Sequence, residues 1–217
     1  MTSDGPEPAT RSASEGPEPA TRSASEGPEP ATWSVSALST GADATRALAA
    51  SLAPVCRVGD VVLLVGGLGA GKTTFAQGFA RGLGVAGPVT SPTFTLVRQY
   101  PCALGGIRQL LHADVYRLES TAEVADLGLA ELVEDDGVAL VEWGDAAAPV
   151  LGDSSLTVTL RAEPSGDGGL PLDTDVGDEV RRVLVQGRGP AWADRSGPVQ
   201  SALAGFAPGT PKPAVEP

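Results

Sequence analysis

Apolar residues in the middle of the chain follow two patterns, short continuous runs and helical spacing. The run Val61–Val65 is entirely aliphatic and ends at two glycines, which is typical of a strand buried on both faces of a parallel sheet. Residues 138–141 form a similar run. Residues 42–53 instead place alanine and leucine at helical spacing, with Ser39 or Thr40 as a candidate cap. This segment predicts a helix that packs on the sheet.

Weaker patterns extend this alternation of strands and helices. Residues 73–83 predict a helix that stops at Gly84. Ser120 and Glu123 have the spacing of a capping box and predict a helix that runs towards Val133. Further strands are expected at residues 95–100, 107–112, 156–160 and 180–185, the first two joined through the loop 101–106.

The order of these elements predicts a three-layer α/β domain with a mixed sheet over residues 34–187, flanked by disordered tails at 1–33 and 188–217. The first tail repeats a Gly-Pro-Glu-Pro-Ala-Thr unit whose copies contain nothing apolar larger than alanine before Trp33. The second is again rich in Gly, Pro and Ala around an isolated Trp192. Such segments bury too little apolar surface to offset the entropy that they lose on ordering.

The two tails are therefore not expected to support the fold. We expect removal of residues 1–32 and 190–217 to leave the thermal midpoint and the activity nearly unchanged. An acidic, glycine-rich stretch near residues 167–178 precedes the last predicted strand. This insertion leaves open whether that strand forms.

Composition narrows the functional classes. The formal net charge is −12, so tight binding of nucleic acid by this chain alone is not expected. Cys56 and Cys102 are the only cysteines, too few for a disulfide framework, and a reducing, cytoplasmic setting is the simplest interpretation. No apolar run is long enough for a membrane span, and the amino terminus lacks the pattern of a secretion signal.

A glycine-rich loop follows the run Val61–Val65 and matches the Walker A pattern in full. Glycines let such a loop curl so that backbone N–H groups point at phosphate oxygens, and the positive end of the next helix adds to the attraction. Lys72 would reach the terminal phosphates, and the Thr73 hydroxyl would bind Mg²⁺. The predicted nucleotide ligands are Gly66, Gly67, Leu68, Gly69, Ala70, Gly71, Lys72, Thr73 and Thr74.

Two acids are candidates for metal binding or catalysis beside this loop. Glu142 ends the apolar run 138–141, which is the Walker B arrangement, and would hold Mg²⁺ through water or orient the attacking water. An ordinary acid at a strand end is the alternative. Asp114 follows a predicted strand, and the sequence alone leaves a catalytic role and a turn-capping role equally open.

Four segments together resemble the TsaE family, formerly called YjeE. They are GGLGAGKTT at 66–74, SPTFTLV at 91–97, HADVYRL at 112–118 and VEW at 141–143. A Walker A motif alone occurs in many enzymes, but this ordered set is specific. The resemblance covers roughly residues 36–163.

The resemblance implies a P-loop fold and a slow Mg-dependent ATPase that works with the TsaB and TsaD proteins. The product of that assembly is N6-threonylcarbamoyladenosine in tRNA next to the anticodon, and tRNA would be met only through the complex. Carried over by position, residues 66–74 bind phosphate, Thr73 and Glu142 serve Mg²⁺, and Asp114 is a catalytic or γ-phosphate-sensing acid. Residues 90–93 resemble a switch that responds to the γ-phosphate.

Some positions keep two interpretations. Gly67 stands where the family usually has aspartate, and we expect the loss of one loop hydrogen bond rather than of activity. Trp143 is placed either near the nucleotide or in the core, and His112, inside a strand, is interpreted as structural.

Three rival functions bear on the interpretation. A small-metabolite kinase would need clustered arginines in a lid, whereas Arg98, Arg108 and Arg117 are scattered. A GTPase is excluded, because its guanine-reading motif is absent and the sequence has no asparagine. A binding protein that holds ATP without hydrolysing it is the non-enzymatic alternative.

Overall fold

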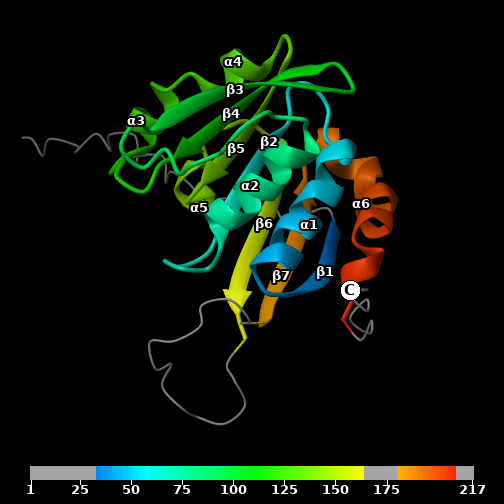
Figure 1. Ribbon diagram of the computed structural model, residues 1–217. Coiled ribbons are helices and arrows are strands. Elements are labelled where there is room, and N and C mark those ends of the chain that lie inside the picture. Colours follow the sequence, from blue (N-terminus) through cyan, green and yellow to red (C-terminus); the bar gives the residue numbers. More distant parts are fainter. Residues whose placement is uncertain (1–32, 164–179, 209–217) are drawn as a thin grey trace, which may run out of the picture.

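A computed structural model describes residues 33–163 and 180–208 of the chain (Figure 1). The repeat at 1–32, the acidic insertion at 164–179 and residues 209–217 lie outside the described residues. The strands are β1 (Trp33–Thr40), β2 (Val61–Val65), β3 (Val97–Leu104), β4 (Ile107–Asp114), β5 (Gly137–Glu142), β6 (Ser155–Ala162) and β7 (Val180–Arg188). The α-helices are α1 (Ala42–Leu52), α2 (Lys72–Gly82), α3 (Thr121–Ala125), α4 (Leu129–Val133), α5 (Gly144–Ala147) and α6 (Ser196–Ala202).

The strands form one seven-stranded sheet in the order β1-β7-β6-β2-β5-β4-β3. Its centre is parallel, because β2 pairs with β5 and β6, and β4 pairs with β5, in that direction. The outer pairs β1–β7, β6–β7 and β3–β4 are antiparallel. The predicted mixed sheet is therefore confirmed, and β2 and β5, the two continuous apolar runs, are its adjacent central strands.

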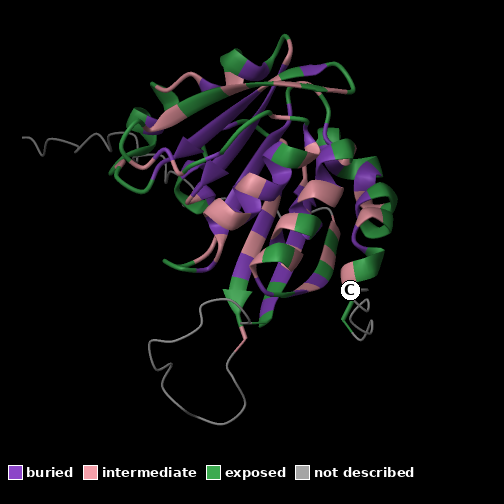
Figure 2. Ribbon diagram, viewed as in Figure 1, coloured by how far each residue is buried: buried purple, intermediate pink, exposed green. Residues whose placement is uncertain are grey.

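Helices cover both faces of the sheet, which gives the predicted three layers (Figures 1 and 2). On one face, Phe75 and Phe79 of α2 and Leu48 and Leu52 of α1 join the larger core cluster. On the other face, α3, α4 and α5 contribute a smaller cluster around Leu63 of β2. Alternate residues of β2 thus serve different cores, which is why this strand has no polar positions.

The helix predicted from Ser120 towards Val133 is interrupted. One of the two capping-box hydrogen bonds forms, since the Ser120 side chain accepts the Glu123 backbone N–H at 3.3 Å. The Glu123 carboxylate accepts from the backbone N–H of Glu119 instead of Ser120. The helix then stops, and a second one begins after Gly128, whose φ of 60° lies in the left-handed region. The prediction of one helix was wrong because the apolar pattern continues past Gly128, where the chain turns.

Strand β1 had no counterpart among the predicted elements. Residues 33–37 alternate apolar and polar side chains, and their burial follows the same period of two, so a strand signal was present. Trp33, assigned to the first tail, is the first residue of this strand. The proposed cap of α1 is also wrong, because Gly41 occupies the N-cap and makes no side-chain hydrogen bond. The Ser39 hydroxyl instead lies 2.7 Å from that of Thr45, inside the protein.

The prediction of a disordered tail at 188–217 is wrong for residues 189–208. This segment contains two 3-10 helices, η2 (Pro190–Arg195) and η3 (Ala204–Phe206), on either side of α6. Trp192 is fully buried and meets Trp33 at 6.4 Å between ring centroids. Arg195 forms a buried ion pair with Asp60, which precedes β2. Few large apolar residues suffice here because each one inserts into the domain.

In the part of the chain that the structure describes, no helix is long and apolar enough to cross a membrane.

Candidate functional site

The predicted site residues meet at one edge of the sheet, where the parallel strands β2, β4 and β5 end. Glu142 pairs in register with Leu64 of β2 and with Asp114 of β4. The glycine-rich loop leaves β2 directly after this point and leads into α2. Ligands of open α/β sheets bind at such carboxyl edges.

The glycine-rich loop needs glycine at two of its positions. Gly66 and Gly71 have φ values of 154° and 98°, and a side chain on Gly66 would come within 2.6 Å of the Leu160 carbonyl oxygen. Helix α2 begins at Lys72, so its positive end faces the loop. Leu68, at the loop's tip, is 94% exposed.

Lys72 crosses back over the loop. Its ammonium donates hydrogen bonds to the carbonyl oxygens of Gly66 at 2.8 Å and Gly67 at 2.9 Å. It also lies 3.6 Å from the centroid of the Trp143 ring, which places Trp143 beside the site rather than in a remote core. Burial lowers the pKa of Lys72, an effect opposed by the nearby charge of Glu142 and then of Asp114.

Glu142 is held by groups from two other elements. The Thr73 hydroxyl of α2 donates to its two carboxylate oxygens at 3.0 and 3.1 Å. Nε2 of His112, on β4, lies 2.9 Å from one of them. His112 was interpreted as structural, and it is fully buried, but it also holds this acid. The carboxylate is 3% exposed, so its orientation is fixed by these contacts.

Asp114 anchors the segment interpreted as a switch. Its carboxylate accepts hydrogen bonds from the hydroxyls of Ser91 at 3.2 Å and Thr93 at 2.7 Å. The other oxygen accepts the backbone N–H of Tyr116 at 3.0 Å, so the turn-capping interpretation also holds. One buried acid therefore joins the end of β4 to the loop before β3.

The donor set suits Mg²⁺ and a polyphosphate. Mg²⁺ prefers oxygen ligands and usually takes only one or two from protein side chains, with phosphates and waters supplying the rest. The Thr73 hydroxyl and the Glu142 carboxylate are already in contact at the helix start. Among the residues that the structure describes, no group of three or more His, Cys, Asp or Glu side chains could hold a metal without a substrate.

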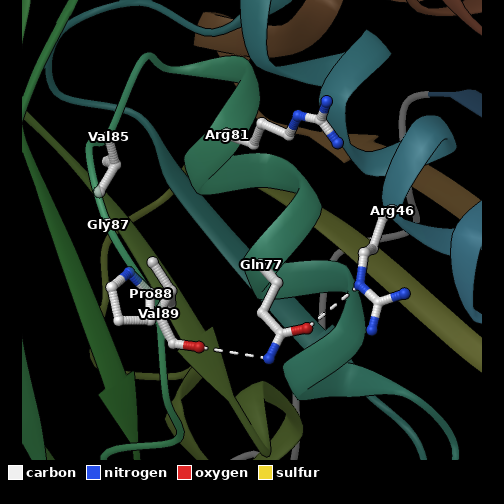
Figure 3. A pocket seen from close by; sticks show the side chains of 7 residues that line it. All are labelled: Arg46, Gln77, Arg81, Val85, Gly87, Pro88 and Val89. Atoms are coloured by element: carbon white, nitrogen blue, oxygen red, sulfur yellow. Dashed lines mark hydrogen bonds between the residues drawn. The ribbon is translucent and has the colours of Figure 1, made fainter.

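A separate pocket of about 320 Å³ lies on the α1–α2 side (Figure 3). It is lined by Arg46, Gln77, Arg81, Val85, Gly87, Pro88 and Val89. Gln77 of α2 accepts a hydrogen bond from Arg46 Nε and donates one to the Val89 carbonyl, both at 3.2 Å. This links the helix behind the glycine-rich loop to the chain that enters the switch segment. The pocket contains none of the predicted phosphate ligands.

The comparisons with known proteins agree with this geometry. A model of the family described as "Threonylcarbamoyl adenosine biosynthesis protein TsaE" matches residues 39–167. The chain belongs to the TsaE family. The family description names threonylcarbamoyl adenosine biosynthesis, and the names of the relatives place this modification in tRNA.

Relatives support the assignment over most of their length. A TsaE protein of Streptomyces coelicolor, named for tRNA threonylcarbamoyladenosine biosynthesis, is 42% identical over 68% of this chain and 93% of its own length. A TsaE protein of Bacillus subtilis is 44% identical over 54% of this chain and 71% of its own. The crystal structure of YdiB from Bacillus subtilis aligns with a TM-score of 0.58 and 30% identity, covering 79% of this chain and 95% of YdiB. The P-loop type of α/β fold is thereby confirmed.

Three contacts of this TsaE-family site were not predicted from the sequence. The first is the contact of His112 with Glu142. His112 lies two residues before Asp114 on β4, so both side chains are on the same face of the sheet, and this spacing could have placed His112 at the site. The partnership of Ser91 and Thr93 with Asp114 depends on a loop conformation that no pattern encodes. Arg181 donates to the glycine-rich loop from β7, a strand far along the sequence.

Proposed function

We propose that this chain is a Mg-dependent ATPase that acts with the TsaB and TsaD proteins to form the N6-threonylcarbamoyl group on adenosine in tRNA. The observation that carries the proposal is the contact of Thr73, which follows Lys72 at the start of α2, with Glu142 at the end of β5. Membership of the TsaE family supplies the pathway. A net charge of −12 favours contact with tRNA through the complex, in the cytoplasm, rather than directly.

Each residue then has a distinct task. The backbone N–H groups of residues 66–74 and the Lys72 ammonium bind the phosphates, with Lys72 exchanging two carbonyl acceptors for phosphate oxygens. Thr73 and Glu142 hold Mg²⁺, which when bound neutralises charge on the terminal phosphates. Asp114 orients water or senses the γ-phosphate through Ser91 and Thr93.

Removing either acid should separate binding from hydrolysis. Glu142→Gln and Asp114→Asn keep the shape of each side chain. Both leave unchanged the backbone N–H groups of the glycine-rich loop that are proposed to bind phosphate. We expect both variants to bind ATP nearly as well as the parent and to hydrolyse it about a hundredfold more slowly, because they lose charge that acts on metal or water. Phosphate release under single-turnover conditions measures this.

The control is Asp126→Asn, an exposed acid at the end of α3. It should hydrolyse ATP at the parental rate. Parental hydrolysis by both site variants would show that the two acids are misassigned. A parent that binds ATP and never releases phosphate would instead favour the non-hydrolysing binding protein.

Partner and nucleotide should be thermodynamically coupled. Phe94 directly follows the switch segment and is 86% exposed, and its neighbour Thr93 donates a hydrogen bond to Asp114. A docked partner can therefore order the same segment as the γ-phosphate, and each should strengthen the binding of the other. We expect slow hydrolysis by the chain alone, faster hydrolysis with the TsaB–TsaD complex, and tighter partner binding with an ATP analogue than with ADP.

Partner affinity in the two nucleotide states, together with steady-state phosphate release, tests the coupling. Thr93→Val should weaken it, because the methyl group cannot donate to Asp114, while the same change at Thr95, whose hydroxyl donates to the Pro92 carbonyl, should not. Equal partner affinity in both nucleotide states with an unchanged rate would overturn the assembly role.

A further inference from the structure

The carbonyl groups of the glycine-rich loop need hydrogen-bond donors, and the loop's proposed function determines where these donors must lie. A trans peptide directs the C=O of one residue and the N–H of the next to opposite sides. A loop whose N–H groups converge on phosphate must therefore point carbonyls outward, where each needs a donor. In this structure the Lys72 ammonium donates to the carbonyls of Gly66 and Gly67, the two acceptors that it would exchange for phosphate oxygens. The carbonyl of Ala70 is served by another residue.

That residue is Arg181, near the start of β7. Its Nε donates to the Ala70 carbonyl oxygen at 3.2 Å, and the side chain is 5% exposed. It fills the space behind Gly71, because a Cβ added to Gly71 would lie 3.4 Å from the same nitrogen. Strand β7 runs antiparallel to β6, so its first residues lie at the edge of the sheet where the loop begins.

We propose that Arg181 is a positioning residue of the phosphate site, which holds the Ala70 carbonyl outward and so leaves the N–H of Gly71 aimed at the nucleotide's phosphates. The inference rests on the proposed ATPase function. A charged donor polarises the peptide that it binds, which makes the Gly71 N–H a stronger donor on the other side. The buried positive charge also lies directly behind a loop that binds an anion.

The neighbouring arginine offers a matched control. Arg182 lies on the opposite face of β7, exposed, where its Nε donates to Glu163 at 2.7 Å. Arg181→Gln removes the charge at the loop, whereas Arg182→Gln removes the same charge one residue away. Arg181→Lys keeps the charge but lacks the planar donor that reaches the carbonyl.

The test is calorimetric affinity for MgATP and MgADP, with the rise in thermal midpoint that saturating MgATP gives. We expect Arg181→Gln to weaken both affinities about tenfold and to reduce that rise, since a charged hydrogen-bond donor is lost. Arg181→Lys should recover part of the affinity, about threefold weaker than the parent. Arg182→Gln should match the parent in both affinities.

Two results would overturn the inference. One is parental affinity in Arg181→Gln. The other is a lower midpoint in both the free and the bound protein with an unchanged rise on MgATP binding, which would make the residue purely structural. A parent that binds no MgATP would instead remove the proposed function itself, so the two failures are distinguishable.

Discussion

Truncation after Arg188 is expected to leave a chain that does not fold at ordinary temperatures, which reverses the expectation from composition that residues 190–217 can be removed without effect. The lost segment contains Trp192, Val199 and Leu203, all essentially fully buried in the larger core cluster. Burying side chains of this size stabilises a protein by about 2 kcal/mol each. Domains of this kind are stable by only about 5–15 kcal/mol in total.

Polar contacts add to the same loss. Asp60, which is 4% exposed, would keep its charge without the ion-pair partner Arg195. Removing one partner from a buried pair costs about 3–5 kcal/mol. The indole nitrogen of Trp33 would also lose its acceptor, the Trp192 carbonyl at 2.6 Å. The sum reaches the whole stability of the domain.

A point variant tests the same packing in a full-length chain. Trp192→Ala should lower the free energy of unfolding by about 3–5 kcal/mol, measured by denaturant titration. Truncation after Pro208 is the control, because residues 209–217 contain no apolar residue larger than valine, and it should change the midpoint little. A stable, cooperatively folding chain ending at Arg188 would show that the segment only rests on the domain.

The C-terminal segment shows what composition alone misses. A stretch rich in Gly, Pro and Ala suggested disorder, yet Trp192 and Arg195 occupy specific positions, one against Trp33 and one against Asp60. Both partners lie far away in the sequence, so local periodicity does not predict these contacts. Average composition describes how much surface a segment can bury, whereas a few well-placed side chains decide whether it does.

The centre of the fold and the core of the site were accessible from the sequence. Aliphatic runs at β2 and β5 have no polar positions because both faces are buried, and such runs are hard to mistake. The grouping of Lys72, Thr73 and Glu142 could be predicted because it follows from local sequence order around strand ends, and their roles stay a prediction. The hydrogen bond between His112 and Glu142 depends on the register of β4 with β5, which the sequence does not determine.

Lys72→Ala should remove most of the affinity for MgATP, by about a hundredfold or more, and hydrolysis with it. The ammonium is one of two cations, with Arg181, that the structure places in contact with the backbone of the glycine-rich loop. Arg181 is committed to the outer side of that loop and cannot replace a charge-assisted contact to the terminal phosphates. The Gly66 and Gly67 carbonyls would also lose their donor.

The chain offers a clean control for this change, since Lys212 is the only other lysine in the sequence. Lys212→Ala alters the net charge equally at a residue that is not among the predicted ligands, and this variant should bind MgATP as the parent does. Lys72→Arg should lose almost as much MgATP affinity as the alanine variant. The compact ammonium fits over the Trp143 ring, whereas the longer, planar guanidinium would have to push that ring aside. Calorimetry measures all three variants. Unchanged MgATP affinity in Lys72→Ala would contradict the assignment of the loop, because that assignment makes the Lys72 ammonium the charged contact to the terminal phosphates.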